Sequence, residues 1–353
     1  MNITFFTPML KLSGGNIVMF KYAEALVKFG HKVTVIAPHS EIINEVKNGV
    51  LIKTFKKFPN RYFEHIFFQL IYLDKFYKLA PDSDIVIPVF FPLAIHALYC
   101  KARGKTKKVI SLFQENKEMY WFGKYIFFIL KISIVHKNID KFITVSNSIA
   151  NEIKRYTGKD AVVIPNGIEH QYFYPRKDKK ENYILFVGTS AKNKGLEYFI
   201  QSFKLLKKDF PELQAKIVSQ NNEKIIDDDI EVINVGADRE KLGDIYSKAL
   251  IYVSQSFNDS FGLPPLEAMA SGTAVILTET DGAKQYAINN VNSIIVPIKN
   301  AVKTANAVTE LLSDDIKRKS LEKEGIVTAE KYQWELASQR FNDEVTKVND
   351  TNK

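Results

Sequence analysis

The sequence predicts an α/β fold made of two doubly wound domains, each a mostly parallel sheet with helices on both faces. Strand-length apolar runs alternate with helix-length segments, and this series starts twice along the chain. A chain of 353 residues is long enough for two domains with separate cores. Continuous apolar strands are typical of parallel sheets that are buried on both faces.

The first series of strands occupies the N-terminal half. Strands are predicted at Asn2–Phe6 and His31–Ala37, and the apolar spacing between them predicts a helix over Ile17–Phe29. This strand–helix–strand unit is followed by more apolar runs separated by helix-length segments. The further strands are expected at Ile85–Val89, Val109–Phe113, Lys141–Val145 and Ala161–Ile164.

The second series follows a linker at Pro165–Pro175, which has a proline at each end and an Asn-Gly turn pair. Its predicted strands are the runs YILFVG, AKIVS, IEVINVG, ALIYVS, AVILT and SIIVP, with helices between them such as Leu196–Lys208 and Lys241–Ala249. Ligands of such sheets bind beyond the carboxyl ends of the strands, so two facing domains predict a site in a cleft.

The net charge of +9 is unevenly distributed along the chain. Residues 1–175 contain 24 basic and 13 acidic residues, a net charge of +11, whereas the remainder contains 25 and 27, a net charge of −2. A basic half indicates a nucleic acid, an anionic membrane or an anionic substrate as partner. Only seven basic residues are arginine, however, and this argues against sequence-specific nucleic-acid binding.

The single cysteine, Cys100, cannot form an internal disulfide, so a cytoplasmic location is expected. The first ten residues have no secretory signal pattern and are predicted to begin with a strand. Two aromatic and basic segments, Phe58–Lys78 and Tyr120–His136, are too polar to span a bilayer. A core helix is the first interpretation of each, and an interfacial helix is the second.

Gly14 and Gly15 connect the first strand to the first helix. Paired glycines let the backbone approach a ligand closely, and the helix N-terminus that follows favours an anion. The pair is not the spaced three-glycine fingerprint of dinucleotide-binding proteins. From these residues alone, an anion site and a tight turn without a ligand both remain open.

The segment Asn258–Ile276 predicts a second turn of this kind. Pro264 and Pro265 suit the first turn of a helix and Gly272 suits its end, so a short helix is predicted over Pro264–Ser271.

The backbone amides of Phe261, Gly262 and Leu263 then lie at a helix N-terminus and form an anion cradle. Asp259 precedes this cradle, and Glu267 is expected in the first helical turn. Two carboxylates beside a phosphate cradle fit a ligand that carries sugars at both ends of a diphosphate.

This segment resembles the donor-binding motif of the large retaining GT-B glycosyltransferase family, family four, in which two acidic residues separated by seven others bracket a Phe-Gly-Leu turn. Asp259 and Glu267 have this spacing. The resemblance covers nearly the whole chain. The other matching segments are SGGN, GHKVTVIAP, VSNS, VIPNGIEHQYFYP, ILFVGTSAKNKGLEYFIQSF and YQWELA.

The resemblance implies two Rossmann-like domains that face a cleft and a closing helix that returns to the first domain. We therefore expect an acceptor-side domain over residues 1–168, a nucleotide-sugar domain over 169–330 and a C-terminal helix over 331–353.

The resemblance also implies roles for individual residues. Glu267 would bind the ribose hydroxyls of the donor, and Asp259 would bind the hydroxyls of the transferred sugar. Lys194 would stabilise the negative charge of the leaving diphosphate. Backbone contacts would come from Gly14, Gly15, Phe261, Gly262 and Leu263. The implied reaction moves a sugar from a UDP- or GDP-linked donor to a saccharide or lipid-linked acceptor in cell-envelope synthesis. It retains the anomeric configuration by front-face attack assisted by the leaving phosphate.

The sequence departs from the family pattern at three places. Thr189 stands where an arginine commonly contacts the diphosphate, and Lys192 is the nearest replacement. Gln114 or Glu115 stands where many relatives have a histidine near the donor sugar. In the third place, a common Gly-Gly pair and glutamate are replaced by Asp281-Gly282 and Gln285.

No metal and no other cofactor is expected, because the six histidines show no metal-ligand spacing. The run Asp82-Ser83-Asp84 resembles the metal motif of the other glycosyltransferase fold, but we expect it to cap a turn. The alternative function is a nucleotide-sugar isomerase or a non-catalytic binding partner, and nucleic-acid binding is a third interpretation. The basic first half further predicts peripheral docking on an anionic membrane.

Overall fold

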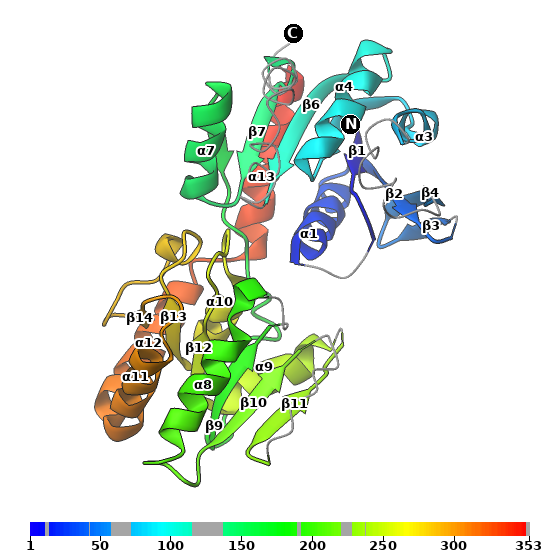
Figure 1. The fold of residues 1–353 in the computed structure, drawn as a ribbon. Helices are drawn as coiled ribbons and strands as arrows, with labels where there is room; N and C mark the ends of the chain where they lie inside the picture. The colour runs from blue at the N-terminus through cyan, green and yellow to red at the C-terminus, as the bar shows by residue number, and fades with distance from the viewer. Residues whose placement is uncertain are drawn as a thin grey trace. The chain divides into compact units, whose positions relative to one another are not determined.

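A computed structural model describes residues 1–10, 14–41, 43–57, 72–114, 137–188, 192–219, 228–236 and 238–350. The chain forms two compact units, one of Met1–Pro165 with Glu335–Lys353 and one of Asn166–Trp334 (Figure 1). The boundaries expected from the sequence were 168/169 and 330/331. Each unit is a sheet with helices, so the prediction of a doubly wound α/β fold is confirmed.

The first unit contains an eight-stranded sheet in the order β3-β4-β2-β1-β5-β6-β7-β8. Its neighbouring strands are parallel except for the pair β3 and β4. The strands are β1 (Asn2–Phe6), β2 (Lys32–His39), β3 (Asn44–Lys47), β4 (Val50–Lys56), β5 (Ser83–Pro88), β6 (Thr106–Phe113), β7 (Lys141–Thr144) and β8 (Ala161–Val163), and the helices are α1 (Gly14–Lys28), α3 (Leu73–Leu79), α4 (Ala94–Ala102), α7 (Asn147–Thr157) and α13 (Trp334–Asp350), with a short helix η1 (Phe91–Leu93) before α4.

The antiparallel hairpin β3–β4 was not predicted. Its two-residue connection is Asn48-Gly49, and both residues have positive φ angles, 50° and 80°. A turn of this type matches the twist of a hairpin, and Asn-Gly is its preferred sequence. The sequence signal was therefore present, but the strands on either side are short and partly polar.

The C-terminal helix α13 packs in the first unit, as the fold prediction required. The ring of Phe341 stacks on Tyr22 with centroids 4.1 Å apart. Asn342 lies 2.8 Å from Nε2 of His31, and Lys141 on β7 forms an ion pair with Glu344. In Figure 1 this helix, drawn in red, runs beside β7.

The acidic run near residue 83 has a structural role that differs from the prediction. Asp84 lies within β5 rather than at a turn. Its carboxylate accepts hydrogen bonds from Lys107 at 2.8 Å and from the backbone of Asn2 at 2.9 Å. These bonds, led by that of Lys107, lower the pKa of Asp84. The carboxylate thus ties together the starts of β1, β5 and β6.

The second unit contains a six-stranded parallel sheet in the order β11-β10-β9-β12-β13-β14. The strands are β9 (Glu181–Val187), β10 (Gln214–Val218), β11 (Ile230–Ile233), β12 (Ala249–Ser254), β13 (Ala274–Thr278) and β14 (Ile294–Val296), and the helices are α8 (Leu196–Leu206), α9 (Arg239–Lys248), α10 (Leu263–Ala270), α11 (Ala301–Ser313) and α12 (Asp315–Ala329), with the short helices η2 (Lys192–Lys194) and η3 (Ala283–Gln285).

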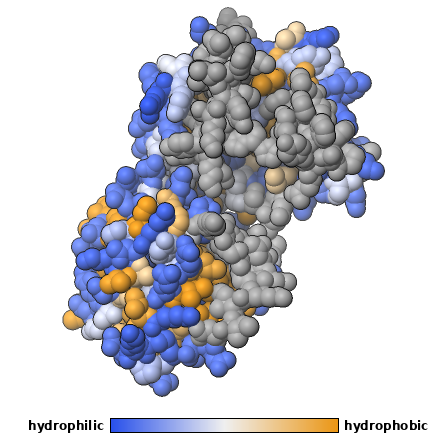
Figure 2. All heavy atoms as spheres, in the orientation of Figure 1, coloured by the Kyte–Doolittle hydropathy of each residue, from blue (hydrophilic) through white to orange (hydrophobic). Residues whose placement is uncertain are grey.

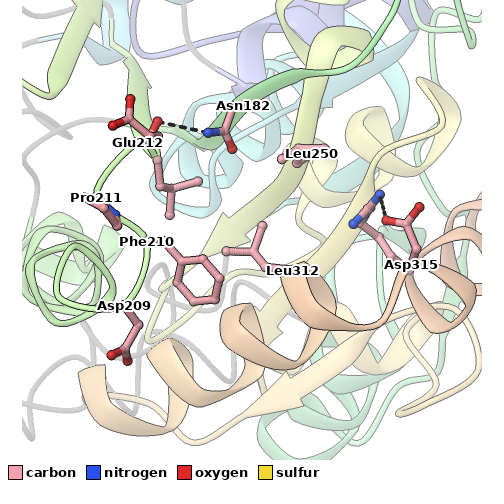
Figure 3. A pocket seen from close by; sticks show the side chains of 10 residues that line it. Asn182, Asp209, Phe210, Pro211, Glu212, Leu250, Leu312 and Asp315 are labelled. Carbon is pink, nitrogen blue, oxygen red and sulfur yellow. Dashed lines mark hydrogen bonds and ion pairs between the residues drawn. The ribbon is translucent and has the colours of Figure 1, made fainter.

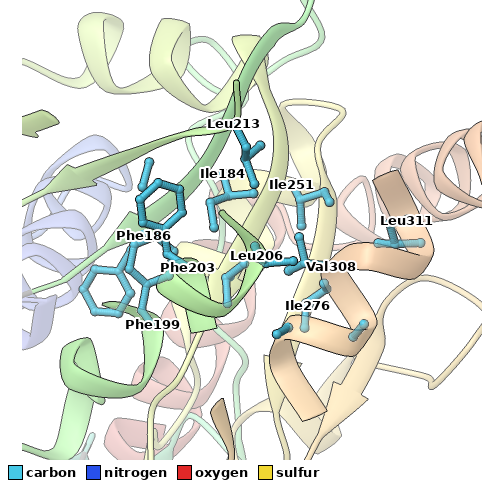
Figure 4. Packing of buried hydrophobic residues seen from close by; sticks show 14 of the residues in the cluster. Ile184, Phe186, Phe199, Phe203, Leu206, Leu213, Ile251, Ile276, Val308 and Leu311 are labelled. Atoms are coloured by element: carbon cyan, nitrogen blue, oxygen red, sulfur yellow. The ribbon is translucent and has the colours of Figure 1, made fainter. Parts of the chain in front are cut away.

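One hydrophobic core of this unit lies between the sheet and the helices α8 and α11. Phe199 and Phe203 of α8 and Val308 of α11 face the strand residues Ile184 and Ile276 (Figure 4). These side chains are all buried. Helix starts in this unit are capped by polar side chains, for example Asp238, Asn300 and Asp314 at α9, α11 and α12.

Most of Phe58–Lys78 and all of Tyr120–His136 lie outside the described residues, so their predicted helices are not assessed. Among the helices that the structure does describe, none has both the length and the apolar content needed to cross a membrane.

His96 on α4 gives the first unit a pH-dependent stability. The ring is buried, with its centroid 4.9 Å from that of Phe76, and burial lowers the pKa of His96 to about 3. In the unfolded chain its pKa is about 6.5, so only the unfolded state takes up a proton as the pH falls below that value. This difference should cost about 2 kcal/mol of the unfolding free energy at pH 5.

We predict that His96→Gln removes this part of the acid sensitivity. Urea unfolding at pH 7 and pH 5 is the measurement, and the loss of stability between the two pH values should be about 2 kcal/mol smaller in the variant than in the wild type. Equal losses in both proteins would contradict the assignment.

Candidate functional site

The candidate site in the second unit is built on loops that follow three neighbouring strands. The strands β9, β12 and β13 are adjacent and parallel, so their carboxyl ends share one edge of the sheet. Such an edge is where open α/β sheets bind ligands. We refer to residues 192–195 as the β9 loop, residues 255–262 as the β12 loop and residues 279–286 as the β13 loop.

Two glycines let the backbones of these loops come into direct contact. A Cβ on Gly195 of the β9 loop would lie 2.2 Å from the carbonyl oxygen of Gln255. A Cβ on Gly282 of the β13 loop would lie 2.6 Å from the carbonyl oxygen of Asp259, to which the Gly282 N–H donates at 2.8 Å. The β12 loop is therefore held between the backbones of its two neighbours.

Lys194 and Asp259 form an ion pair across this contact. The Nζ of Lys194 lies 2.5 Å from Oδ1 of Asp259, and both side chains are partly exposed, by 32% and 17%. The structure thus brings together Asp259, which the resemblance assigns to the transferred sugar, and Lys194, which it assigns to the leaving diphosphate, the two residues expected to be catalytic. An anion that approaches the β12 loop meets an ammonium group whose position is already set.

The helix α10 starts one residue earlier than predicted. Gly262 is its N-cap with a φ of +84°, and the helix runs over Leu263–Ala270. Because the left-handed Gly262 lets the helix begin at Leu263, Glu267 is the fifth helical residue. It lies in the second turn, which corrects the prediction that placed it in the first. Within the described residues, no acceptor binds the N–H of Phe261, Gly262 or Leu263.

Glu267 lies in a buried charge network. Arg239 donates from Nη2 to Oε1 of Glu267 at 2.7 Å and from Nε to Oε2 of Glu169 at 2.9 Å. The hydroxyl of Tyr246 lies 3.3 Å from the other oxygen of Glu267, and burial, assisted by the charge of Glu267, raises the pKa of Tyr246. The Arg239 guanidinium also lies over Phe173, 4.6 Å from the ring centroid. A carboxylate oxygen can accept about two hydrogen bonds. The bonds from Arg239 and Tyr246 use one site on each oxygen of Glu267, so Glu267 keeps acceptor capacity for a ligand.

Tyr286 supports the turn before α10 from the β13 loop. Its hydroxyl donates to the carbonyl oxygen of Gly262 at 2.8 Å. Burial, reinforced by the charge of Asp259, raises the pKa of Tyr286, so the hydroxyl stays protonated and remains a donor. The ring lies edge-on to Phe261 with centroids 6.1 Å apart.

In the first unit, the structure brings the predicted glycine pair close to Gln114. The helix α1 begins at Gly14, and a Cβ on Gly15 would lie 3.4 Å from Oε1 of Gln114, a buried residue that follows β6. Both segments lie at the carboxyl edge of the parallel strands β1 and β6. The amide of Gln114 therefore faces the backbone of the glycine turn.

A residue next to the glycine pair holds the turn in place. Asn16 donates from Nδ2 to the carbonyl oxygen of Met9 at 2.9 Å and accepts a hydrogen bond from Thr7 at 3.0 Å. These bonds connect the start of α1 to the segment that follows β1. Asn16 is the last residue of the SGGN motif, but its anchoring role was not predicted.

Some predicted site residues are not assessed. Thr189 and Glu115 lie outside the described residues, and for Lys192 only the backbone is described, in η2. Arg239, Glu169, Tyr246, Tyr286 and Asn16 were not predicted as site residues. Glu169 and Asn16 lie within matching motif segments but were given no role, and no motif marks Arg239, Tyr246 or Tyr286.

A cavity of about 460 Å³ lies at the opposite edge of the same sheet. Its apolar floor is formed by side chains that gather where β9, β10 and β12 begin (Figure 3). Arg318 at its rim is paired with Asp315. The cavity contains none of the predicted site residues. Its lining is Asn182, Asp209, Phe210, Pro211, Glu212, Leu213, Leu250, Leu312, Asp315 and Arg318.

We predict that Arg239→Gln destabilises the second unit, because Glu169 and Glu267 would be left buried without their counter-ion. Urea unfolding at pH 7 should show a loss of about 3 kcal/mol. Adding Glu169→Gln should recover part of this loss. The matched control is Arg176→Gln, because its partners Glu240 and Asp244 are more exposed than Glu169 and Glu267, so its loss leaves no buried carboxylate unpaired and should cost less. Equal losses for the two arginines would contradict the prediction.

Comparison with known proteins identifies the family. The family described as Glycosyltransferase Family 4 matches residues 12–172, and that described as Glycosyl transferases group 1 matches residues 168–327. The two matched ranges therefore correspond closely to the two halves of the chain.

Two curated relatives and one solved structure illustrate the similarity. An O-antigen chain mannosyltransferase of Salmonella typhimurium is 28% identical over 204 residues, 52% of this chain and 57% of the relative. A phosphatidyl-myo-inositol mannosyltransferase of Mycolicibacterium smegmatis is 25% identical over 219 residues, 58% of this chain and 56% of the relative. The matched part is thus little more than half of each relative's length.

The structural similarity covers the full fold. The Anabaena protein HepE, solved in complex with UDP-glucose, has a TM-score of 0.80 at 12% identity over 98% of this chain and 99% of that one. With the ordered motifs, the loop geometry and both family matches in agreement, the chain belongs to the GT-B glycosyltransferases of the group 1 and family 4 type.

Proposed function

We propose that this glycosyltransferase moves a sugar from a UDP- or GDP-linked donor to a saccharide or lipid-linked acceptor of the cell envelope, with retention of the anomeric configuration. The observation that carries the proposal is the turn before α10. There, N–H groups with no acceptor among the described residues lie between the carboxylates of Asp259 and Glu267. The names of the two mannosyltransferase relatives support an acceptor of this kind, and the UDP-glucose complex of HepE supports a UDP donor.

The diphosphate of the donor is assigned to the N-terminus of α10 and to Lys194. Breaking the anomeric bond builds negative charge on the diphosphate, and fixed donors at that place act most strongly in the transition state. The amides of Gly262 and Leu263 and the helix dipole supply such donors. Lys192 is proposed to replace the arginine that many relatives have at the position of Thr189. These groups supply the positive charge, so we propose no metal and no other cofactor.

The two carboxylates are assigned to the two sugars of the donor. Asp259 would accept hydrogen bonds from hydroxyls of the transferred sugar, with Lys194 holding its orientation at 2.5 Å. Glu267 would accept those of the ribose, with Arg239 holding one of its oxygens at 2.7 Å. Both carboxylates are oriented by a cation before the donor arrives, which lowers the cost of reorganisation during binding.

Retention follows from front-face transfer in this proposal. The acceptor hydroxyl attacks on the side that the diphosphate leaves, and its proton passes to a leaving phosphate oxygen, so no protein nucleophile is required. The backbones of Gly14 and Gly15 are assigned to the diphosphate and the transferred sugar, and Gln114 or Glu115 is assigned to the position near the transferred sugar.

We predict that Asp259→Asn lowers sugar transfer at least about 100-fold, whereas Glu267→Gln weakens nucleoside-diphosphate binding about 10-fold, equivalent to about 1.4 kcal/mol. Calorimetric titration with UDP and GDP and an assay for nucleoside-diphosphate release from nucleotide sugars are the measurements. Glu240→Gln, an exposed acidic residue on α9, is the control. Unchanged turnover in both site variants would refute the assignments.

The alternative function gives a different result in the same assays. A nucleotide-sugar isomerase or a non-catalytic partner would bind UDP or GDP but release no nucleoside diphosphate from any nucleotide sugar in the presence of envelope acceptors.

We further propose that the first unit docks on an anionic membrane, on its cytoplasmic face. The segments before β6, β7 and β8 (residues 101–108, 137–141 and 154–160) contain ten basic and two acidic residues. They lie at the amino edge of the sheet, away from the glycine turn. Figure 2 shows mostly hydrophilic residues, with a few hydrophobic ones, on the coloured surface of this unit. Each well-placed basic residue contributes about 1 kcal/mol near an anionic surface. Positive charge alone would also suit a nucleic acid as partner. The low arginine content argues against that alternative.

Flotation with anionic vesicles tests this docking. The double variant Arg103→Glu with Arg155→Glu removes two exposed basic residues of the edge, so it should bind at least about 30-fold more weakly, at about 1 kcal/mol per charge. The same charge change at Lys208 and Lys303 in the second unit is the control and should have little effect. Equal recovery with neutral vesicles would refute a role for charge.

A further inference from the structure

The Tyr286 hydroxyl is connected to the cradle through a single peptide unit. The carbonyl of Gly262 and the N–H of Leu263 belong to the same peptide, which is planar and trans, so the two groups point in opposite directions. Tyr286 holds the carbonyl oxygen at 2.8 Å. The hydrogen bond therefore also sets the direction of the Leu263 N–H, the first amide of α10.

The position of the Tyr286 hydroxyl is itself determined by packing. The ring is buried and lies edge-on to Phe261 and Tyr332, with centroids 6.1 Å and 6.2 Å away. The backbone carbonyl of Tyr286 accepts a hydrogen bond from Asn292 at 2.7 Å. The side chain and the backbone of Tyr286 are thus both held, and its hydroxyl needs no rearrangement to reach Gly262.

Glycine at position 262 is required for this contact. A Cβ there would lie 2.8 Å from the hydroxyl oxygen of Tyr286, and the φ of +84° is one that other residues rarely adopt. Any larger residue would displace either the hydroxyl or the turn. Gly262 and Tyr286 therefore form one structural unit, although they belong to different loops.

We propose that Tyr286 is a positioning residue for the donor: its hydroxyl directs and polarises the Leu263 N–H toward the diphosphate of the nucleotide sugar. The inference rests on the proposed function, in which the diphosphate lies at this helix N-terminus. A hydrogen bond donated to a carbonyl strengthens the N–H of the same peptide as a donor, because linked hydrogen bonds polarise one another. The gain is largest when the leaving diphosphate acquires charge. Tyr286 contacts the peptide and not the donor.

The variant Tyr286→Phe tests the inference, because it removes the hydroxyl and keeps the ring. Tyr332→Phe is the matched control. Tyr332 belongs to the same aromatic cluster, and its hydroxyl also donates to a backbone carbonyl at 2.8 Å, but that carbonyl belongs to Gln285, outside the cradle. The two variants therefore lose the same kind of hydrogen bond at different places.

Calorimetry with UDP and with uridine separates positioning from general structure, and GDP with guanosine repeats the comparison for the other base. Tyr286→Phe should weaken binding of the diphosphate about 5- to 10-fold and leave binding of the nucleoside unchanged, because only the diphosphate reaches the Leu263 amide. In the transfer assay its kcat should fall more than its KM rises. Tyr332→Phe, which loses a bond to the peptide before Tyr286 but keeps the Tyr286 hydroxyl, should change each of these values less than Tyr286→Phe does.

Several outcomes would overturn the inference. Equal loss of UDP and uridine binding in Tyr286→Phe would show a general structural effect, and wild-type affinity for both would show no effect. In either case the proposed function still holds if the wild type binds UDP or GDP and transfers sugar. If the wild type itself binds neither UDP nor GDP, the proposed function fails, and the inference fails with it.

A second measurement does not depend on ligand binding. In protein labelled with 15N-leucine, the amide proton resonance of Leu263 should move upfield in Tyr286→Phe, because its peptide loses the polarising bond, and should stay in place in Tyr332→Phe. An unchanged Leu263 resonance in Tyr286→Phe would overturn the inference even if the variant binds donors poorly.

Discussion

The candidate site depends on the close backbone contact between the β12 loop and its two neighbours. At Gly195 and Gly282 the chains approach so closely that a single added carbon would lie 2.2 Å and 2.6 Å from carbonyl oxygens of the β12 loop. Parallel strands bring the three loops to one edge, and the glycines let them touch there. This contact sets where Asp259 and the first turn of α10 lie.

Three of the groups assigned to the donor are held in place before a donor binds. Lys194 holds Asp259, Arg239 holds Glu267, and Tyr286 holds the peptide that precedes α10. Preorganisation of this kind reduces the ordering that binding must impose and keeps dipoles directed at the place where charge develops. The N–H groups at the start of α10 keep their capacity for an anion. The second unit thus combines side chains held by ion pairs with N–H groups that have no acceptor among the described residues.

Features that depend on local patterns were predictable. Apolar runs located the parallel strands, and the two prolines after Gly262 located α10 to within one residue. The hairpin with Asn48-Gly49 was missed although its turn signal was present, because its first strand is exposed and its apolar pattern is weak. The placement of Glu267 in the first turn was wrong, because the left-handed Gly262 starts the helix at Leu263.

The sequence by itself determined the two-domain α/β architecture and the spacing of Asp259 and Glu267 around a glycine turn, because both depend on residues that are neighbours in the chain or follow a strand or helix period. Only the tertiary structure decided which side chains hold that motif in place. Arg239 reaches Glu169 and Glu267 across 70 and 28 residues, and Tyr286 reaches Gly262 across 24. Such pairs are set by the order of strands in the sheet and by loop packing, and neither is encoded in a local pattern.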